Sequence, residues 1–326
     1  MANWSNSTMK KMSNKVIFFG NERLATGART TAPIFRALLD NNYSIQALII
    51  AQNDFGKSRK YRAVEVDYLA ETNNIPVFAP KNIGEEVEHI KSFGADIGVL
   101  VAYGKIIPQA VIDIFPLGII NIHPSLLPKH RGPTPIESIL INSPYRGGVS
   151  IMKLTTKMDA GPIYAQKIVP LIGNETKREL TQELQLIGRD LLIENLPLII
   201  SGELTPTAQD DSLATYDHRL TKKDSIIDWN KSAQQIDREI RAYQDWPKAK
   251  AKLGNINVSI IEAKVEPSST GLPGEINVIK DTETISVKTG EGSIHIKKLQ
   301  PDGKNIMTSA EFIRGYGDKI TKSSSD

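Results

Sequence analysis

The sequence contains no cysteine among its 326 residues. A disulfide framework, a thiolate metal site and a cysteine nucleophile are therefore excluded, and we expect a reducing compartment, the cytoplasm. No apolar run approaches the roughly 18–20 residues that a membrane span requires, so we expect no membrane association. The formal net charge of +3 is too small to indicate nucleic-acid binding by itself, so any such surface has to be local.

Motifs for several common chemistries are also missing. No GxGxxG or other phosphate-binding loop follows the first predicted strand, and no GxSxG nucleophile elbow is present. The histidines lack the spacing of a metal site. They are His89, His123, His130, His218 and His295. We therefore expect no resident metal, and a covalent nucleophile has little support.

Short apolar runs alternate with helical patterns over the first 200 residues. The predicted strands are 15–20, 45–50, 96–104 and 117–123, and the predicted helices are 31–40 and 63–73. Strands that are continuously apolar, in a βαβα order, are typical of an open twisted α/β sheet with mostly parallel strands. Ligands of such sheets bind beyond the carboxyl ends of the strands.

The alternation continues to about residue 200, and the pattern changes only after the polar stretch that follows. A helix at 132–140, two strands at 147–154 and 161–171 and a long helix at 177–200 precede a polar stretch without periodicity. Beyond it, a helix and several short apolar runs separated by Gly, Pro and Asn predict a small OB-like β-barrel. The expected parts are a disordered extension (1–14), a catalytic domain (15–206), a linker (207–220), a barrel domain (221–320) and a tail (321–326).

Polar side chains interrupt the apolar pattern at the end of the strand 117–123. Asn121 and His123 are two positions apart, so they project from the same face of the sheet. Asp159, in the turn "KMDAGPIY", is the candidate third member. A carboxylate favours one tautomer and the charged form of an imidazole, and an amide can donate to an oxygen that gains negative charge. The three residues suit acyl transfer without a covalent nucleophile.

Each of these residues also has a structural interpretation. Histidine at a strand end is more often structural than catalytic, and aspartate is a common turn former. Spacing alone does not establish that Asp159 approaches His123, so this approach is a prediction.

Three motifs in order resemble the 10-formyltetrahydrofolate-dependent formyltransferases: "VAYGKIIP", "NIHPSLLPKHRGPTPI" and "MDAGPIY". The resemblance implies a Rossmann-like formyltransferase domain in which Asn121, His123 and Asp159 are catalytic. It implies 10-formyltetrahydrofolate as the formyl donor and no metal. The residues expected to contact the folate are Ser125, Leu126, Leu127, Pro128, Tyr103 and Gly104.

The C-terminal part narrows this resemblance. The stretch "ELTPTAQDDSLATYDHRL" and the ending "KKLQPDGKNIMTSAEFIRGY" are similar to the family members that formylate initiator methionyl-tRNA. The resemblance implies initiator methionyl-tRNA as the acceptor and an OB-like domain that helps to hold it. We expect a monomer. The predicted tRNA contacts are Arg59, Lys60, Arg62, Lys248 and Lys250.

Three alternatives stay open. Formyltransferases that act on nucleotide-linked amino sugars share the catalytic half, so such a sugar is a second possible acceptor. A tRNA- or folate-binding protein without catalysis and a hydrolase that releases formate are the others.

Overall fold

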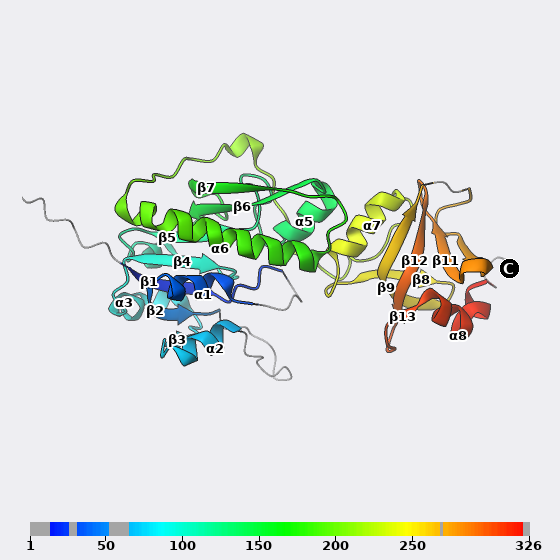
Figure 1. Cartoon of the computed structure of the whole chain (residues 1–326), viewed down its shortest axis with the longest axis horizontal. Helices are drawn as coiled ribbons and strands as arrows, with labels where there is room; N and C mark the ends of the chain where they lie inside the picture. Colours follow the sequence, from blue (N-terminus) through cyan, green and yellow to red (C-terminus); the bar gives the residue numbers. More distant parts are fainter. Residues whose placement is uncertain (1–13, 26–30, 52–64, 268–269, 322–326) are drawn as a thin grey trace, which may run out of the picture.

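The computed structural model describes residues 14–25, 31–51, 65–267 and 270–321. The predicted disordered extension, apart from residue 14, and the predicted tail, apart from residue 321, lie outside the described residues. Within them the chain forms two sheets, one in each half of the sequence (Figure 1). No described helix combines the length and the apolar character needed to cross a membrane.

The first sheet has the strand order β3-β2-β1-β4-β5-β6-β7. Its strands are β1 (Lys15–Gly20), β2 (Ser44–Ile49), β3 (Val77–Phe78), β4 (Ile97–Val101), β5 (Ile119–His123), β6 (Arg146–Lys153) and β7 (Ile163–Pro170). The five strands from β3 to β5 run parallel, whereas β6 and β7 pair antiparallel at one edge. The predicted mostly parallel α/β sheet is therefore confirmed.

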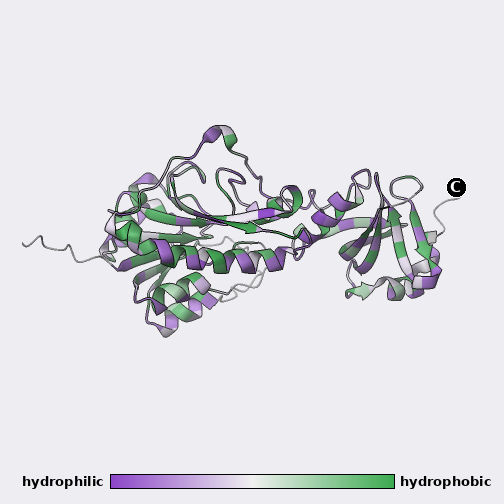
Figure 2. Ribbon diagram, turned by 45° about the horizontal axis from the view of Figure 1, so that its top comes forward, coloured by the Kyte–Doolittle hydropathy of each residue, from purple (hydrophilic) through white to green (hydrophobic). Residues whose placement is uncertain are grey.

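Helices cover both faces of this sheet. They are α1 (Pro33–Asp40), α2 (Glu65–Thr72), α3 (Val87–Ser92), α4 (Gln109–Ile112), α5 (Pro135–Asn142) and α6 (Lys177–Ser201), with 3₁₀ turns η1 (Ile83–Glu85) and η2 (Asp211–Leu213). Every residue of β4 and of β5 is buried, as expected for central strands covered on both sides. Figure 2 shows hydrophobic and hydrophilic residues alternating along the long helix α6.

The long helix α6 is fixed at both ends by its sequence. Thr176 and Glu179 form a capping box at the start, and Gly202 takes the left-handed conformation that ends the helix. Its apolar face packs against α1, β6 and β7. The helix thereby closes one side of the sheet and leaves the carboxyl ends of β4 and β5 to the loops that follow them.

The second sheet has the order β10-β11-β12-β9-β8, with β13 paired to β12, and all its pairs are antiparallel. The elements of this half are α7 (Ala233–Ala242), β8 (Ala249–Leu253), β9 (Ile256–Glu266), β10 (Ile276–Ile279), η3 (Lys280–Thr282), β11 (Thr284–Lys288), β12 (Ser293–Pro301), β13 (Met307–Thr308) and α8 (Ser309–Thr321). The predicted fold class, a mostly parallel domain followed by a small β domain, is confirmed.

Helix α7 connects the two halves. Its residues Ile236 and Ile240 belong to the core of the second sheet, whereas Tyr243, just beyond the helix, belongs to the core of the first. The fully buried Lys177 donates to the carbonyl of Trp246 at 2.8 Å. An ammonium group held in this way ties the start of α6 to the segment that leads into β8.

The turn after β1 contains a buried carboxylate at the start of α1. Glu22 is fully buried and accepts hydrogen bonds from the backbone N–H of Ile34 at 3.1 Å and of Phe35 at 2.7 Å. These N–H groups lie in the first helical turn, where no intrahelical acceptor is available. Burial raises the pKa of Glu22 to about 8, although the two backbone donors act in the opposite direction.

The raised pKa of Glu22 predicts a pH dependence of stability. Its pKa of about 8 in the folded protein lies above the ordinary glutamate value of 4.5, so the folded state binds the proton more tightly. The contribution to stability is complete below pH 4.5 and is lost as the pH rises toward 8, by up to about 1.4 kcal/mol per pH unit. Urea unfolding of wild type and Glu22→Gln between pH 5 and 8 should show a shallower decline for the variant. An equal decline of the free energy of unfolding with pH in both proteins would contradict the raised pKa of Glu22.

Candidate active site

Two polar side chains extend from the last strand of the parallel part of the sheet. Along β5, Ile120 and Ile122 belong to one core, while Ile119 lies in the core on the opposite face. Asn121 and His123 share the face of Ile119 by alternation, as predicted, and both are buried. The strand therefore places an amide and an imidazole side by side at its carboxyl end.

The turn between β6 and β7 brings Asp159 to these two residues. Its Oδ1 lies 3.7 Å from Nδ1 of His123 and accepts a hydrogen bond of 3.4 Å from Nδ2 of Asn121. Its Oδ2 accepts from the backbone N–H of Gly132 at 2.8 Å. Asp159 adopts a left-handed conformation with φ of 48°, which aspartate tolerates better than most residues. The structure thus brings the three predicted catalytic residues together.

A backbone carbonyl defines which nitrogen of His123 faces the carboxylate. Nε2 lies 2.9 Å from the carbonyl oxygen of His130, which can only accept, so this nitrogen carries a hydrogen. Nδ1 is left on the side of Asp159. The carbonyl of His130, rather than Asp159, therefore fixes the tautomer, and Nδ1 is the nitrogen available to take up or deliver a proton.

The predicted folate loop is held by the hydroxyl of Ser150 on β6. This hydroxyl donates to the carbonyl of Ser125 at 2.6 Å and accepts from the N–H of Leu127 at 3.0 Å. Gln166 on β7 donates to the carbonyl of Leu127 and to the same hydroxyl, both at 2.8 Å. The loop after β5 is thus anchored to the two antiparallel strands beside it.

Members of the loop differ in exposure. Ser125 and Leu127 are buried, whereas Leu126 and Pro128 are half-buried. A Cβ added to Gly148 would lie only 2.4 Å from Cδ2 of Leu126, so the glycine leaves the space that Leu126 fills. Leu126 and Pro128 are therefore the side chains of this loop that a ligand can reach.

The loop after β4 carries the other two predicted folate residues. Tyr103 is only 3% exposed, and its ring meets that of Phe19 edge-on at 6.0 Å between centroids. Within the described chain its buried hydroxyl has no hydrogen-bond partner, and burial raises the pKa of Tyr103 to about 12. Gly104 and Ile106 are exposed. In this loop Gly104 and Ile106 thus reach the surface, whereas the side chain of Tyr103 does not.

The predicted tRNA contacts divide into two groups. Arg59, Lys60 and Arg62 lie outside the described residues. Lys248 donates to Oε1 of Gln300 at 2.8 Å, and Nζ of Lys250 lies 3.1 Å from Oδ1 of Asp302. Both ammonium groups therefore lie beside β12 with a partner already in place, and their contact with tRNA stays a prediction.

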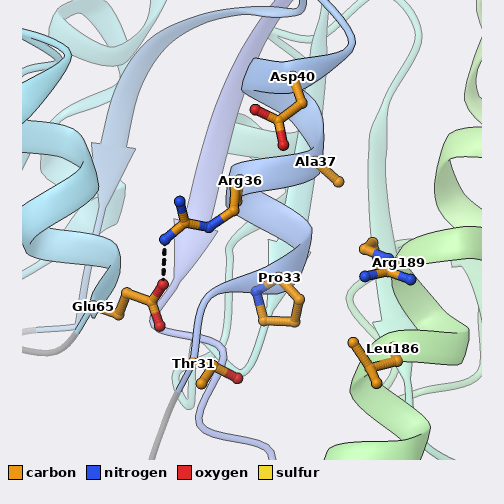
Figure 3. Close-up of a pocket in the computed structure, with 8 residues that line it drawn as sticks. All are labelled: Thr31, Pro33, Arg36, Ala37, Asp40, Glu65, Leu186 and Arg189. Carbon is orange, nitrogen blue, oxygen red and sulfur yellow. Dashed lines mark hydrogen bonds and ion pairs between the residues drawn. The ribbon is translucent and has the colours of Figure 1, made fainter.

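A surface pocket lies away from these residues. It has a volume of about 310 Å³ and lies between α1 and α6, with Arg36 bound to Glu65 at its edge (Figure 3). None of the three predicted catalytic residues lines it. Among the residues that the structure describes, no three His, Asp or Glu side chains gather in a way that could hold a metal ion.

Several residues that support the site escaped the sequence analysis. Ser150 and Gln166 anchor the loop after β5. Gln209 donates to the carbonyl of Asp159 and accepts from Arg131. Ser150 could have been found from the sequence, because it is a polar residue within the apolar run "GGVSIM". Gln209 offered no such signal, because it lies in a polar stretch without periodicity.

Comparison with known proteins identifies the class of protein that this fold and site define. Residues 15–196 match the formyl transferase family model and residues 219–317 match the model of the formyl transferase C-terminal domain. The chain belongs to the formyl transferase family, so the predicted family and the prediction of an enzyme are confirmed.

Curated relatives match nearly the whole chain. A methionyl-tRNA formyltransferase from Roseiflexus castenholzii is 36% identical over 93% of this chain and 96% of its own length. One from Coxiella burnetii is 33% identical over 95% of this chain and 98% of its own length.

Solved structures share the fold at lower identity. An N-formyltransferase from Helicobacter canadensis is 20% identical with a TM-score of 0.64, covering 89% of this chain and all of that one. HypX from Aquifex aeolicus, in a complex with tetrahydrofolic acid, is 18% identical with a TM-score of 0.63. The match covers 95% of this chain but only 48% of HypX.

The anchoring of the loop by Ser150 leads to a prediction. Ser150→Ala leaves the buried N–H of Leu127 without its acceptor, so we expect the free energy of unfolding to fall by about 1–3 kcal/mol. We also expect a higher KM for the formyl donor. Urea unfolding and steady-state kinetics measure both effects, and Ser286→Ala, at a buried serine of β11, is the control. An unchanged stability would show that this hydroxyl does not hold the loop.

Proposed function

We propose that this protein transfers the formyl group of 10-formyltetrahydrofolate to the methionine amino group of initiator methionyl-tRNA. The observation that carries the chemistry is the approach of Asp159 to Nδ1 of His123 beside the amide of Asn121, at the carboxyl end of β5. The choice of acceptor is supported by the relatives named methionyl-tRNA formyltransferase, which match 93% and 95% of this chain.

The first chemical step is attack of the amine on the formyl carbon. Negative charge then develops on the formyl oxygen, and stabilising it is the main task of the protein. Nδ2 of Asn121 and a protonated Nδ1 of His123 are both donors on the same side of β5. Asp159 stabilises the imidazolium, because its carboxylate lies within ion-pair distance of Nδ1.

Proton transfer completes the reaction. The attacking amine becomes positively charged as its new bond to carbon forms, and it has to lose a proton. Asp159 is the carboxylate nearest to the donors Asn121 and His123, so it accepts this proton directly or through a water. The electron pair on the formyl oxygen then re-forms the carbonyl as the bond between the formyl carbon and the folate nitrogen breaks. That nitrogen receives the proton that Asp159 took from the amine, which restores the carboxylate.

The residues beside the site suit a reduced folate as the donor. Ile106 is 82% exposed and Leu126 is half-buried, and they follow the neighbouring strands β4 and β5. Apolar side chains at the open edge of a sheet offer a surface for a flat ring system. Gly104 leaves backbone groups accessible there. Among solved structures of this fold, that of HypX contains tetrahydrofolic acid, which agrees with this assignment.

The second half of the chain has the role of holding the tRNA. In this proposal the formyltransferase domain is 15–206, the OB-like domain is 221–320, and Lys248 and Lys250 contact phosphates. Binding that depends on phosphate neutralisation weakens steeply with salt. In this proposal the protein acts as a monomer in the cytoplasm, a reducing compartment that agrees with a chain without cysteine.

A nucleotide-linked amino sugar is the second candidate acceptor. The Helicobacter canadensis N-formyltransferase, which shares this fold, was solved with folinic acid and dTDP-3-aminofucose. At 20% identity this likeness concerns the fold alone, and the catalytic trio serves either amine.

An acceptor comparison tests the proposed substrate. We expect rapid formylation of charged initiator methionyl-tRNA, slow formylation of charged elongator methionyl-tRNA and none of dTDP-3-aminofucose. The measurement follows labelled formyl transferred from 10-formyltetrahydrofolate to each acceptor at equal concentration. Faster transfer to the amino sugar would favour the second candidate, and release of formate without an acceptor would favour a hydrolase.

Substitutions test the catalytic roles. His123→Ala and Asp159→Ala should each lower kcat about 100- to 10,000-fold, because each removes a group that stabilises charge or moves a proton. The Kd for initiator tRNA, measured by filter binding, should stay within about threefold of wild type because neither residue contacts phosphate in this proposal. Near-normal turnover in both variants would remove the proposed roles.

A further inference from the structure

The segment predicted as a linker crosses the active-site loop instead of running free between the two halves. We call residues 207–217 the strap. Backbone bonds join Arg131 N–H to Thr215 O at 2.9 Å, Thr215 N–H to Pro128 O at 3.2 Å, and Asp217 N–H to Arg131 O at 2.7 Å. Figure 1 shows this segment, in yellow-green, running past β7 at the edge of the first sheet before the chain enters α7.

The buried Arg131 guanidinium lies beneath the strap. Arg131 is only 1% exposed, and its side-chain donors end on strap residues. Nη1 donates to the hydroxyl of Tyr216 at 2.8 Å, and Nη2 donates to Oδ1 of Asp211 at 2.7 Å. Nε and Nη2 both donate to Oε1 of Gln209, at 3.1 and 2.8 Å. A buried cation needs such partners, so the strap is held firmly over the loop.

The amide of Gln209 links Arg131 to the turn that contains Asp159. Its oxygen is occupied by Arg131, which leaves the amide nitrogen directed the other way. Nε2 donates to the carbonyls of Asp159 at 2.9 Å and Gly161 at 2.6 Å. All four hydrogen-bonding positions of the amide are therefore used. Gln209 therefore holds the backbone of Asp159, and the left-handed conformation of that residue directs its carboxylate toward His123.

The strap also holds His130, whose carbonyl positions the imidazole of His123. Thr215 accepts the N–H of His130 at 2.8 Å through its hydroxyl, and Asp217 lies 3.4 Å from Nδ1 of the His130 ring. The carbonyl of His130 in turn accepts from His123. One segment thus fixes both the carboxylate side and the imidazole side of the site.

We propose that Gln209 is a positioning residue for formyl transfer, which acts by holding the Asp159 turn at the distance from His123 that the reaction needs. The inference rests on the function proposed above, because its kinetic readout is formyl transfer. Gln209 contacts neither reacting group, and only its amide nitrogen holds the Asp159 turn. A variant that keeps the acceptor for Arg131 but loses this donor therefore changes the geometry of the trio and leaves the anchoring of the loop after β5 in place. An error of about 1 Å in such a geometry can lower a rate by about 100-fold.

Gln209→Glu tests this inference with little change in shape. The new carboxylate still accepts from Arg131 but faces the carbonyls of Asp159 and Gly161 without a hydrogen to donate. We expect kcat to fall about 10- to 100-fold and KM for both substrates to change less than about threefold. Gln182→Glu makes the same chemical change on the exposed face of α6 and should keep wild-type kinetics.

A second measurement does not depend on activity. The N–H of Ala160 donates to the carbonyl of Lys157 at 3.3 Å within the catalytic turn. Hydrogen exchange of this turn, followed by mass spectrometry, should be faster in Gln209→Glu than in wild type or Gln182→Glu. Should Gln209→Glu prove too unstable to assay, Gln209→Asn keeps the amide, is uncharged and should show the same changes in smaller measure.

Two results would overturn the inference. One is an unchanged kcat and unchanged exchange in a folded Gln209 variant, while wild type transfers formyl normally. The other is an equal rise of KM and fall of kcat together with loss of structure across the domain, which indicates a general structural role. Absence of formyl transfer in wild type itself would instead contradict the proposed function and leave the exchange result to decide the role of Gln209.

Discussion

The guanidinium of Arg131 is a positive charge inside the protein, and the arrangement of the active site follows from the need to satisfy it. A buried charge without partners costs several kcal/mol, so acceptors have to be supplied from elsewhere in the chain. Gln209, Asp211 and Tyr216 supply them. Because these acceptors belong to one segment, pairing Arg131 also draws that segment across the loop after β5.

Close approach of the strap depends on a position without a side chain. Gly132 has φ of 117°, and a Cβ there would lie 2.5 Å from the carbonyl oxygen of Asp217. Its N–H is also a donor to Asp159. The glycine thus allows strap and loop to meet and supplies a hydrogen bond to the catalytic carboxylate.

The fold was predictable where the sequence has strong periodicity, and the trio was predictable from its motifs. The strap was not, because Arg131 and Gln209 are 78 positions apart and a polar segment without periodicity gives no sign of long-range contacts. Helix α8 was missed because Gly315 and Gly317 weaken its helical pattern. The burial of Tyr103 was also not predictable, because the motif "VAYGKIIP" indicates the family but not which of its side chains are exposed.

His123 and Asp159 act as one unit in this mechanism, and a double-mutant cycle on kcat tests their interdependence most directly. If the two side chains depend on each other, His123→Ala/Asp159→Ala should be about as slow as the slower single variant. If the fold-losses of the two single variants multiply in the double variant, the side chains act independently. That result would contradict the mechanism derived from their 3.7 Å approach.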